Sequence, residues 1–265
     1  MNIYLTELRH QWKALAFWSL GIVAFMVSAM SKYDGYRKAG TSVNEIFREL
    51  PGGISAFFGA DILDLQSVGG FFTICALYLA VMLGIHALLM GSGIIAKEET
   101  DKTIEFLVAK PVSRDRILLA KLLVGLTTIV ILNLVTLAVS IASVAPFDPG
   151  PTDNGDIVFL MPSVFAIQLI FLVIGLTFAA VMRQPRHAGM LSGAVLLASF
   201  ILSAWVDISG RLRFLRFLTP FQYFDQKSIY ANHAYSAAHV VIAAAAVAVM
   251  LAASRFVYRG RDFSL

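Results

Sequence analysis

The chain is poor in charge and in cysteine, and both shortages narrow its class. Charged residues make up 14% of its 265 residues and hydrophobic residues 58%, whereas soluble domains carry roughly 25% charged and roughly 45–50% apolar residues. The single cysteine, Cys75, leaves no disulfide within the chain and no cysteine metal site. The composition indicates an integral membrane protein. Its net charge of +4 then reflects basic loops rather than a nucleic-acid partner.

The chain also lacks the motifs of an enzyme or of a self-powered transporter. It has no GxSxG, HExxH or GxxxxGK[ST] sequence, so no nucleophile elbow, zincin site or P-loop is expected. Cys75 and His86 share a helix face, but they lie about 16 Å apart along the helix axis, too far for a nucleophile–base pair. Ionisable residues are nearly absent from the middles of the apolar runs, which disfavours proton or sodium coupling. Transport would therefore need an energy source outside this chain.

Six apolar runs are long enough to cross a membrane, and they predict an all-α membrane protein with one transmembrane domain over residues 1–265. The predicted spans are residues 14–31, 69–96, 118–145, 157–182, 188–206 and 235–258. Gly189 and Gly193 form a GxxxG pattern in the fifth run, which predicts close helix packing within the subunit or, as the alternative, against a second subunit.

Two kinds of shorter segment accompany the spans. In Met1–Lys13, apolar residues recur at helical spacing, which predicts an N-terminal interfacial helix. The alternative is that this segment forms the first turns of the next helix. Leu50–Leu63 is apolar, broken by glycine and too short to span, so it predicts a re-entrant or amphipathic piece.

The distribution of basic residues predicts that both termini are cytoplasmic. With the N-terminus inside, 13 of the 21 Lys and Arg residues fall on that side and 8 on the other. The connection Pro146–Asp156 contains three aspartates and no basic residue, and is best placed outside. Residues 97–117 then form a cytoplasmic loop between the second and third spans.

That loop carries a pattern of its own. A short helix is predicted by three apolar residues at positions i, i+3 and i+4: Ile104, Leu107 and Val108. Acidic residues crowd its N-terminal end, where the helix dipole favours negative charge: Glu98, Glu99 and Asp101. Pro111 ends this helix, and Ser113 can N-cap the next one. The alternative is a solvated loop whose charges only set the topology.

The stretch EETDKTIEFLVAKPVSRDRILLAK, residues 98–121, resembles the signature between the second and third helices of ABC-2 type permeases, the membrane subunits of bacterial ABC exporters. The positions that match the family pattern are Thr103, Glu105, Leu107, Pro111, Val112, Ser113, Arg114 and Lys121. Lys102 stands where glycine is usual, and Ala120 where glycine is frequent. Three further segments resemble family pieces in the right order: Leu50–Leu63, Thr219–Asp225 and Arg259–Asp262.

The resemblance implies two permease subunits of six helices each, paired as a homodimer among membrane lipids, with two cytosolic P-loop ATPase subunits beneath them. The ATPases would bind ATP and Mg²⁺, so this chain would hold no cofactor, metal or catalytic residue. Its loop would be the coupling helix. The residues assigned to ATPase coupling are Glu98, Glu99, Thr103, Glu105, Leu107, Pro111, Ser113 and Arg114.

The implied function is outward movement of a lipid-like, peptide or drug-like substrate across the bacterial cytoplasmic (inner) membrane, driven by ATP hydrolysis on the partner. The alternative is a non-transporting membrane anchor or sensor subunit coupled to an ATPase.

Overall fold

The structure of the protein is a computed structural model that describes residues 3–38, 43–50, 52–59, 62–100, 113–147, 151–182, 184, 187–209 and 213–260. Within these residues every regular element is a helix. The long helices are α1 (Ile3–Lys38), α4 (Val68–Thr100), α6 (Arg114–Val144), α7 (Pro151–Val181), α8 (Ala188–Ser209) and α11 (Ala237–Gly260). The short ones are α2 (Val43–Arg48), α3 (Gly52–Phe58), η1 (Ala145–Phe147), η3 (Arg213–Leu218), α9 (Pro220–Tyr223) and α10 (Gln226–Asn232).

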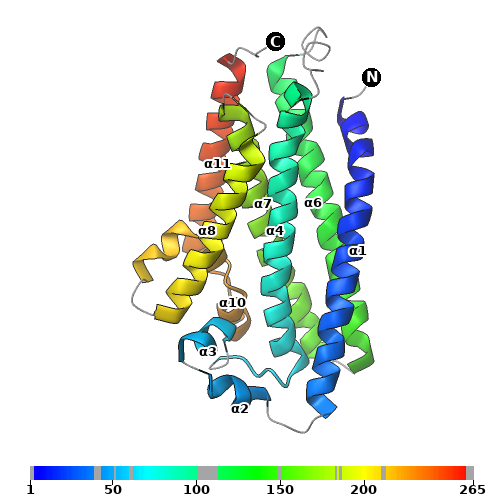
Figure 1. The fold of residues 1–265 in the computed structure, drawn as a ribbon, viewed down its shortest axis with the longest axis vertical. Coiled ribbons are helices and arrows are strands. Elements are labelled where there is room, and N and C mark those ends of the chain that lie inside the picture. The colour runs from blue at the N-terminus through cyan, green and yellow to red at the C-terminus, as the bar shows by residue number, and fades with distance from the viewer. Residues whose placement is uncertain are drawn as a thin grey trace.

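The six long helices stand side by side as an upright bundle (Figure 1). Each is long and apolar enough to cross a membrane, which confirms the predicted all-α membrane fold with six spans. The first turns of α1 and the last turns of α11 lie at the same end, as expected for an even number of spans (Figure 1). We call this the terminal end, and the opposite end, which holds α2 and α3, the far end.

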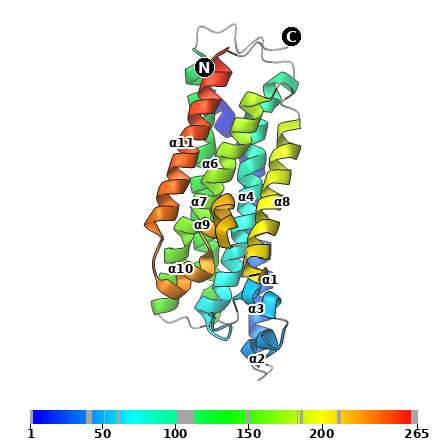
Figure 2. The ribbon, with the colours of Figure 1, turned by 90° about the vertical axis from the view of Figure 1, so that its left-hand side faces the viewer.

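Helices α4 and α7 form the centre of the bundle (Figures 1 and 2). In the most apolar window of each, 61% of the residues are buried, against 17% for α1 and 11% for α11. Phe72 and Leu79 of α4 and Phe171 of α7 are fully enclosed in one hydrophobic cluster. The outer faces of α1, α8 and α11 are apolar and uncovered, as suits helices that face lipid or another subunit.

Two glycines let α4 and α7 approach each other closely. A Cβ placed on Gly91 of α4 would lie 2.2 Å from the carbonyl oxygen of Leu172, and one placed on Gly175 of α7 would lie 2.3 Å from that of Leu88. Small residues bring membrane helices into backbone contact in this way. In the predicted GxxxG pair of α8, only Gly189 meets a neighbouring helix, through Ser92 of α4, so its contact lies within the subunit.

The separate interfacial helix predicted for Met1–Lys13 is wrong, and the alternative holds. Helix α1 runs without a break from Ile3 to Lys38, because no glycine or proline interrupts its first 18 residues. Tyr4 and Leu8 pack against the hydrophobic cluster at the terminal end instead of a membrane surface. The Tyr4 hydroxyl also lies 2.9 Å from the Thr127 hydroxyl of α6, within hydrogen-bond distance.

Short helices occupy both long connections of the far half. Helices α2 and α3 follow α1, and η3, α9 and α10 follow α8. Figure 2 shows α9 and α10 alongside the lower half of α7 rather than beyond its end. Their depth relative to a membrane stays a prediction.

Candidate functional site

The predicted coupling residues divide into three groups in the structure. Glu98 and Glu99 belong to the last turn of α4, and Ser113 and Arg114 stand at the start of α6. The remaining four lie outside the described residues: Thr103, Glu105, Leu107 and Pro111. The described ends of α4 and α6 both point to the terminal end (Figure 1). The contacts around these two helix ends therefore define the candidate site.

Ser113 starts α6 in the way that the sequence predicts. Its backbone is extended, with φ −66° and ψ 147°, and its hydroxyl accepts a hydrogen bond from the backbone N–H of Arg116 at 3.4 Å. An N-cap of this kind satisfies a backbone donor that has no partner inside the helix. The predicted cap is confirmed, whereas a role of Ser113 in coupling stays a prediction.

Arg114 ties the start of α6 to the end of α11. Its Nη1 donates to the backbone carbonyl of Arg259 at 2.9 Å and reaches that of Tyr258 at 3.5 Å. The last carbonyls of a helix have no partner within it, and they carry the negative end of the helix dipole, so a guanidinium stabilises them on both counts. Arg114 thus acts as a side-chain cap on a helix 144 residues further along the chain.

Asp115 strengthens the same contact with two ion pairs. Its carboxylate accepts from Nε and Nη2 of Arg255, both at 3.2 Å, and from Nε of Arg259 at 2.7 Å and its Nη2. Both guanidiniums therefore bind one carboxylate in the two-pronged geometry that suits planar groups. We call Asp115, Arg255 and Arg259 the α6–α11 clamp. All three side chains are partly exposed, between 32% and 59%.

Lys121 fastens the first part of α6 to α4 and α1. Its side chain is fully buried, its Nζ donates to the backbone carbonyl of Ile94 on α4, and it lies 3.6 Å from Oε1 of Glu7 on α1. Burying an ammonium is costly unless it is paired and hydrogen-bonded, as it is here. Through Lys121, Arg114 and Asp115, the start of α6 is joined to α1, α4 and α11.

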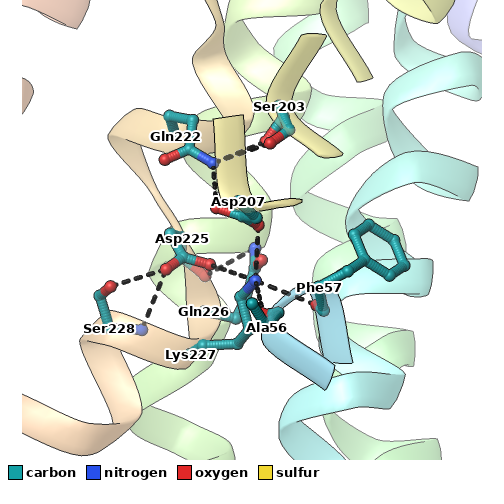
Figure 3. A network of polar contacts seen from close by, with 10 residues as sticks. Ala56, Phe57, Ser203, Asp207, Gln222, Asp225, Gln226, Lys227 and Ser228 are labelled. Carbon is teal, nitrogen blue, oxygen red and sulfur yellow. Dashed lines mark hydrogen bonds and ion pairs between the residues drawn. The ribbon is translucent and has the colours of Figure 1, made fainter. Parts of the chain in front are cut away.

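A second polar cluster lies towards the far end, where sequence reasoning placed no site (Figure 3). Lys227 of α10 is 5% exposed. Its Nζ lies 2.6 Å from Oδ2 of Asp207 at the end of α8 and 3.9 Å from Oδ1 of Asp225, and donates to the carbonyl of Phe57 on α3 at 3.0 Å. We call this cluster the Lys227 pin, because one ammonium holds α3, α8 and α10 together.

Neighbouring groups complete the surroundings of the Lys227 pin. Gln222 of α9 donates through Nε2 to Oδ1 of Asp207 at 2.7 Å and to the Ser203 hydroxyl at 3.1 Å (Figure 3). Gly59 ends α3 with φ +71°, in the left-handed region that favours glycine. A Cβ there would also lie 2.8 Å from Cδ of Lys227, so Gly59 makes room for the lysine stem.

Several buried polar side chains among the described residues make contacts between helices. Among the described residues, no group of three His, Cys, Asp or Glu side chains could hold a metal ion. His86 is buried against Trp18, with ring centroids 5.2 Å apart, and Cys75 is buried separately. Burial raises the pKa of the Tyr235 phenol, which precedes α11, to about 12, and the hydroxyl donates to the Phe159 carbonyl at 2.5 Å. These contacts hold the helices in place.

The α6–α11 clamp and the Lys227 pin were both missed from the sequence. Asp115 and its arginine partners are 140 and 144 residues apart, so no local spacing reveals their contact. Lys121 offers a better signal, because a lysine inside an apolar run needs a partner. Lys227 follows an aromatic stretch and an N-capping aspartate, which indicates a structured loop without naming its partner.

Of two comparisons with known proteins, one identifies a family for this bundle. Residues 1–263 match the family model described as "ABC-2 family transporter protein". A comparison with curated proteins found no match.

Proposed function

The chain belongs to the ABC-2 transporter family, and from this premise we propose that it is an exporter subunit driven through the connection between α4 and α6. Family membership makes the chain a multi-pass membrane permease component of an ABC transporter and implies association with an ABC ATPase subunit. The proposal adds the direction, which is outward, and the route by which energy enters. It also adds pairing with a second copy of this chain, and a bacterial inner membrane with both termini on the cytoplasmic side.

The observation that carries the proposal is the way the start of α6 is fastened. Arg114 and Asp115 hold it to α11, and Lys121 holds it to α4 and α1. A push on the connection between α4 and α6 therefore acts on four helices together instead of bending one loop. Rigid-body motion of an ATPase pair that receives this connection becomes a rigid-body motion of the bundle. ATP and Mg²⁺ act on the ATPase, and this chain contributes only mechanical coupling.

The interior of the bundle supports an amphipathic substrate. Within the described spans, Asn133 on α6 and Gln168 on α7 form an amide pair, and most of the buried side chains are apolar. A strongly hydrated solute would find few partners there, whereas a lipid-like, peptide or drug-like molecule can move along the apolar outer faces of the subunits. The substrate class proposed is therefore lipid-like, peptide or drug-like.

The test is coupled transport in liposomes with the co-purified P-loop ATPase. Glu105→Lys reverses a charge of the proposed coupling segment, and Glu49→Lys makes the same change at an exposed far-end position. We expect Glu105→Lys to lose substrate-stimulated ATP hydrolysis at least tenfold while the protein still inserts, and Glu49→Lys to behave as wild type. Normal stimulated hydrolysis and transport by Glu105→Lys would sink the assignment. An ATPase that binds but drives no export of any amphipathic class would indicate an anchor or sensor instead.

Orientation is tested separately by cysteine labelling. Cys75 is buried, so a cysteine introduced at position 100 or 153 is the reactive thiol in each variant. We expect Thr100→Cys to react with a membrane-impermeant reagent from the inner side and Asp153→Cys from the outer side. Labelling of both positions from one side would contradict the topology.

A further inference from the structure

An apolar pocket opens beside the α6–α11 clamp at the terminal end. It has a volume of about 290 Å³ and lies between α6, α7 and α11. Its lining consists of five leucines and two members of the clamp: Leu118, Leu119, Leu122, Leu176, Leu251, Asp115 and Arg255. Coupling between helices needs no such cavity, so the pocket is a feature that the proposed function leaves unexplained.

The pocket faces sideways, towards the surroundings of the bundle. Its floor is Leu176 of the central helix α7, which is 1% exposed, and its rim includes Leu119 of α6, which is 55% exposed. Its other wall belongs to α11, the least buried of the six spans. In a membrane, such an opening meets hydrocarbon chains rather than water.

The α6–α11 clamp, which contributes Asp115 and Arg255 to the rim of the pocket, carries an excess of positive charge. Arg255 and Arg259 share the single carboxylate of Asp115, and Arg114 adds a third guanidinium that caps α11. Each of the two clamp arginines uses Nε and Nη2 on Asp115, and a guanidinium has five N–H donors. Each therefore keeps donors for a further acceptor, and the three arginines with Asp115 carry a net charge of +2. Arginine forks match the oxygens of a phosphate diester.

We infer that this pocket binds one anionic phospholipid, with an acyl chain among the leucines and the phosphate against Arg255 and Arg259. The leucines and the arginines lie next to each other, as the acyl chain and the headgroup of a lipid do at the membrane interface. A free phosphate would use the rim alone and leave the leucines empty. A zwitterionic lipid would bring a cation to a rim whose only carboxylate, among the lining residues, already serves two arginines. The lipid would brace α6 against α11 from outside, and the inference does not depend on export by this chain.

The test is native mass spectrometry of the full chain released from mild detergent. Equal amounts of phosphatidylglycerol and phosphatidylcholine with identical acyl chains are offered. We expect one retained phosphatidylglycerol per chain, favoured at least fivefold over phosphatidylcholine, and no retention of soluble glycerol phosphate. Arg255→Gln should weaken phosphatidylglycerol about fivefold, since one arginine near the surface contributes about that factor. Leu251→Phe, which fills the pocket, should weaken both lipids.

The matched control is Arg9→Gln, which removes an exposed arginine at the same end of the bundle but away from the pocket. It should leave the retained lipid unchanged. Equal retention of both lipids, or equal losses in Arg9→Gln and Arg255→Gln, would mean ordinary surface attraction and overturn the inference. A lipid-free dimer that Leu251→Phe abolishes would make the groove a protein interface, which also overturns it. Should Arg255→Gln not fold, Leu251→Phe decides, since it keeps every charge and must still lose the lipid.

Discussion

The close contact between α4 and α7 allows the loss of stability in Gly91→Ala to be predicted quantitatively. In Gly91→Ala the new Cβ starts 2.2 Å from the Leu172 carbonyl oxygen, and real Cβ contacts lie beyond 3.0 Å, so the helices must separate by about 0.8 Å. The clashing atom belongs to the backbone and cannot rotate away. We therefore expect a cost at the upper end for overpacking, about 3 kcal/mol. At about 2–4 °C per kcal/mol, the Tm falls by about 6–12 °C.

The chain supplies its own reporter for this experiment. Cys75 is its only cysteine, lies in α4 and is 3% exposed, so a thiol-reactive fluorophore labels it only as the bundle unfolds. The matched control is Gly193→Ala on α8, where a Cβ meets nothing within 4 Å. Its Tm should change little, because surface substitutions usually stay within about 0.5 kcal/mol.

A double variant separates this explanation from a general intolerance of substitution. Gly175→Ala creates the reciprocal clash with Leu88, and one separation of the helices relieves both. Gly91→Ala/Gly175→Ala should therefore cost clearly less than the two single changes added together. Full additivity, or a Gly91→Ala variant as stable as Gly193→Ala, would refute the contact as described.

Three further predictions use the same thermal assay. Lys227→Met should lower the free energy of unfolding by about 3 kcal/mol, because it leaves the carboxylates of the Lys227 pin without their cation. The control Lys32→Met, at an exposed position, should leave it unchanged, and equal effects of the two variants would contradict the pin. Ser113→Ala should cost about 0.5–1 kcal/mol as a lost N-cap and Ser113→Asp should restore it; a silent Ser113→Ala would mean that the cap contributes nothing. Lys121→Met should lower the free energy of unfolding by about 3 kcal/mol and Glu7→Gln by about 1 kcal/mol, because Lys121 keeps its hydrogen bond to the α4 carbonyl in Glu7→Gln. A larger loss in Glu7→Gln than in Lys121→Met would contradict these contacts.

Much of the fold follows from the sequence because a long apolar run crosses a membrane as a helix. The number and order of the spans can therefore be predicted from the sequence. The residues at which each helix begins and ends are harder to predict. Helix α1 begins well before residue 14 because Tyr4 and Leu8 find a protein surface, and a stripe at helical spacing does not say whether it meets protein or lipid. The tightest helix contact was also hidden, since Gly91 and Gly175 belong to different spans and form no motif together.

The candidate site also has a part that the sequence predicts and a part that it does not. The cap at Ser113 is local chemistry, and the sequence predicts it correctly. The clamp partners of Asp115 and the pin partners of Lys227 depend on which helices become neighbours, which one sequence does not reveal. The coupling role of residues 97–117 stays a prediction that rests on the family pattern.

The Lys227 pin also sets an order of events during biosynthesis. The Phe57 carbonyl of α3 accepts its hydrogen bond from Lys227, which is 170 residues further along the chain. At ordinary rates of translation, Lys227 is synthesised roughly 10–30 s after Phe57. Arg114 likewise lacks its carbonyl partner until α11 has been synthesised. The first half of the protein therefore enters the membrane with open positions that only the last two spans and their connection fill. A chain whose synthesis stops before α10 would therefore lack the ammonium that joins α3 to α8.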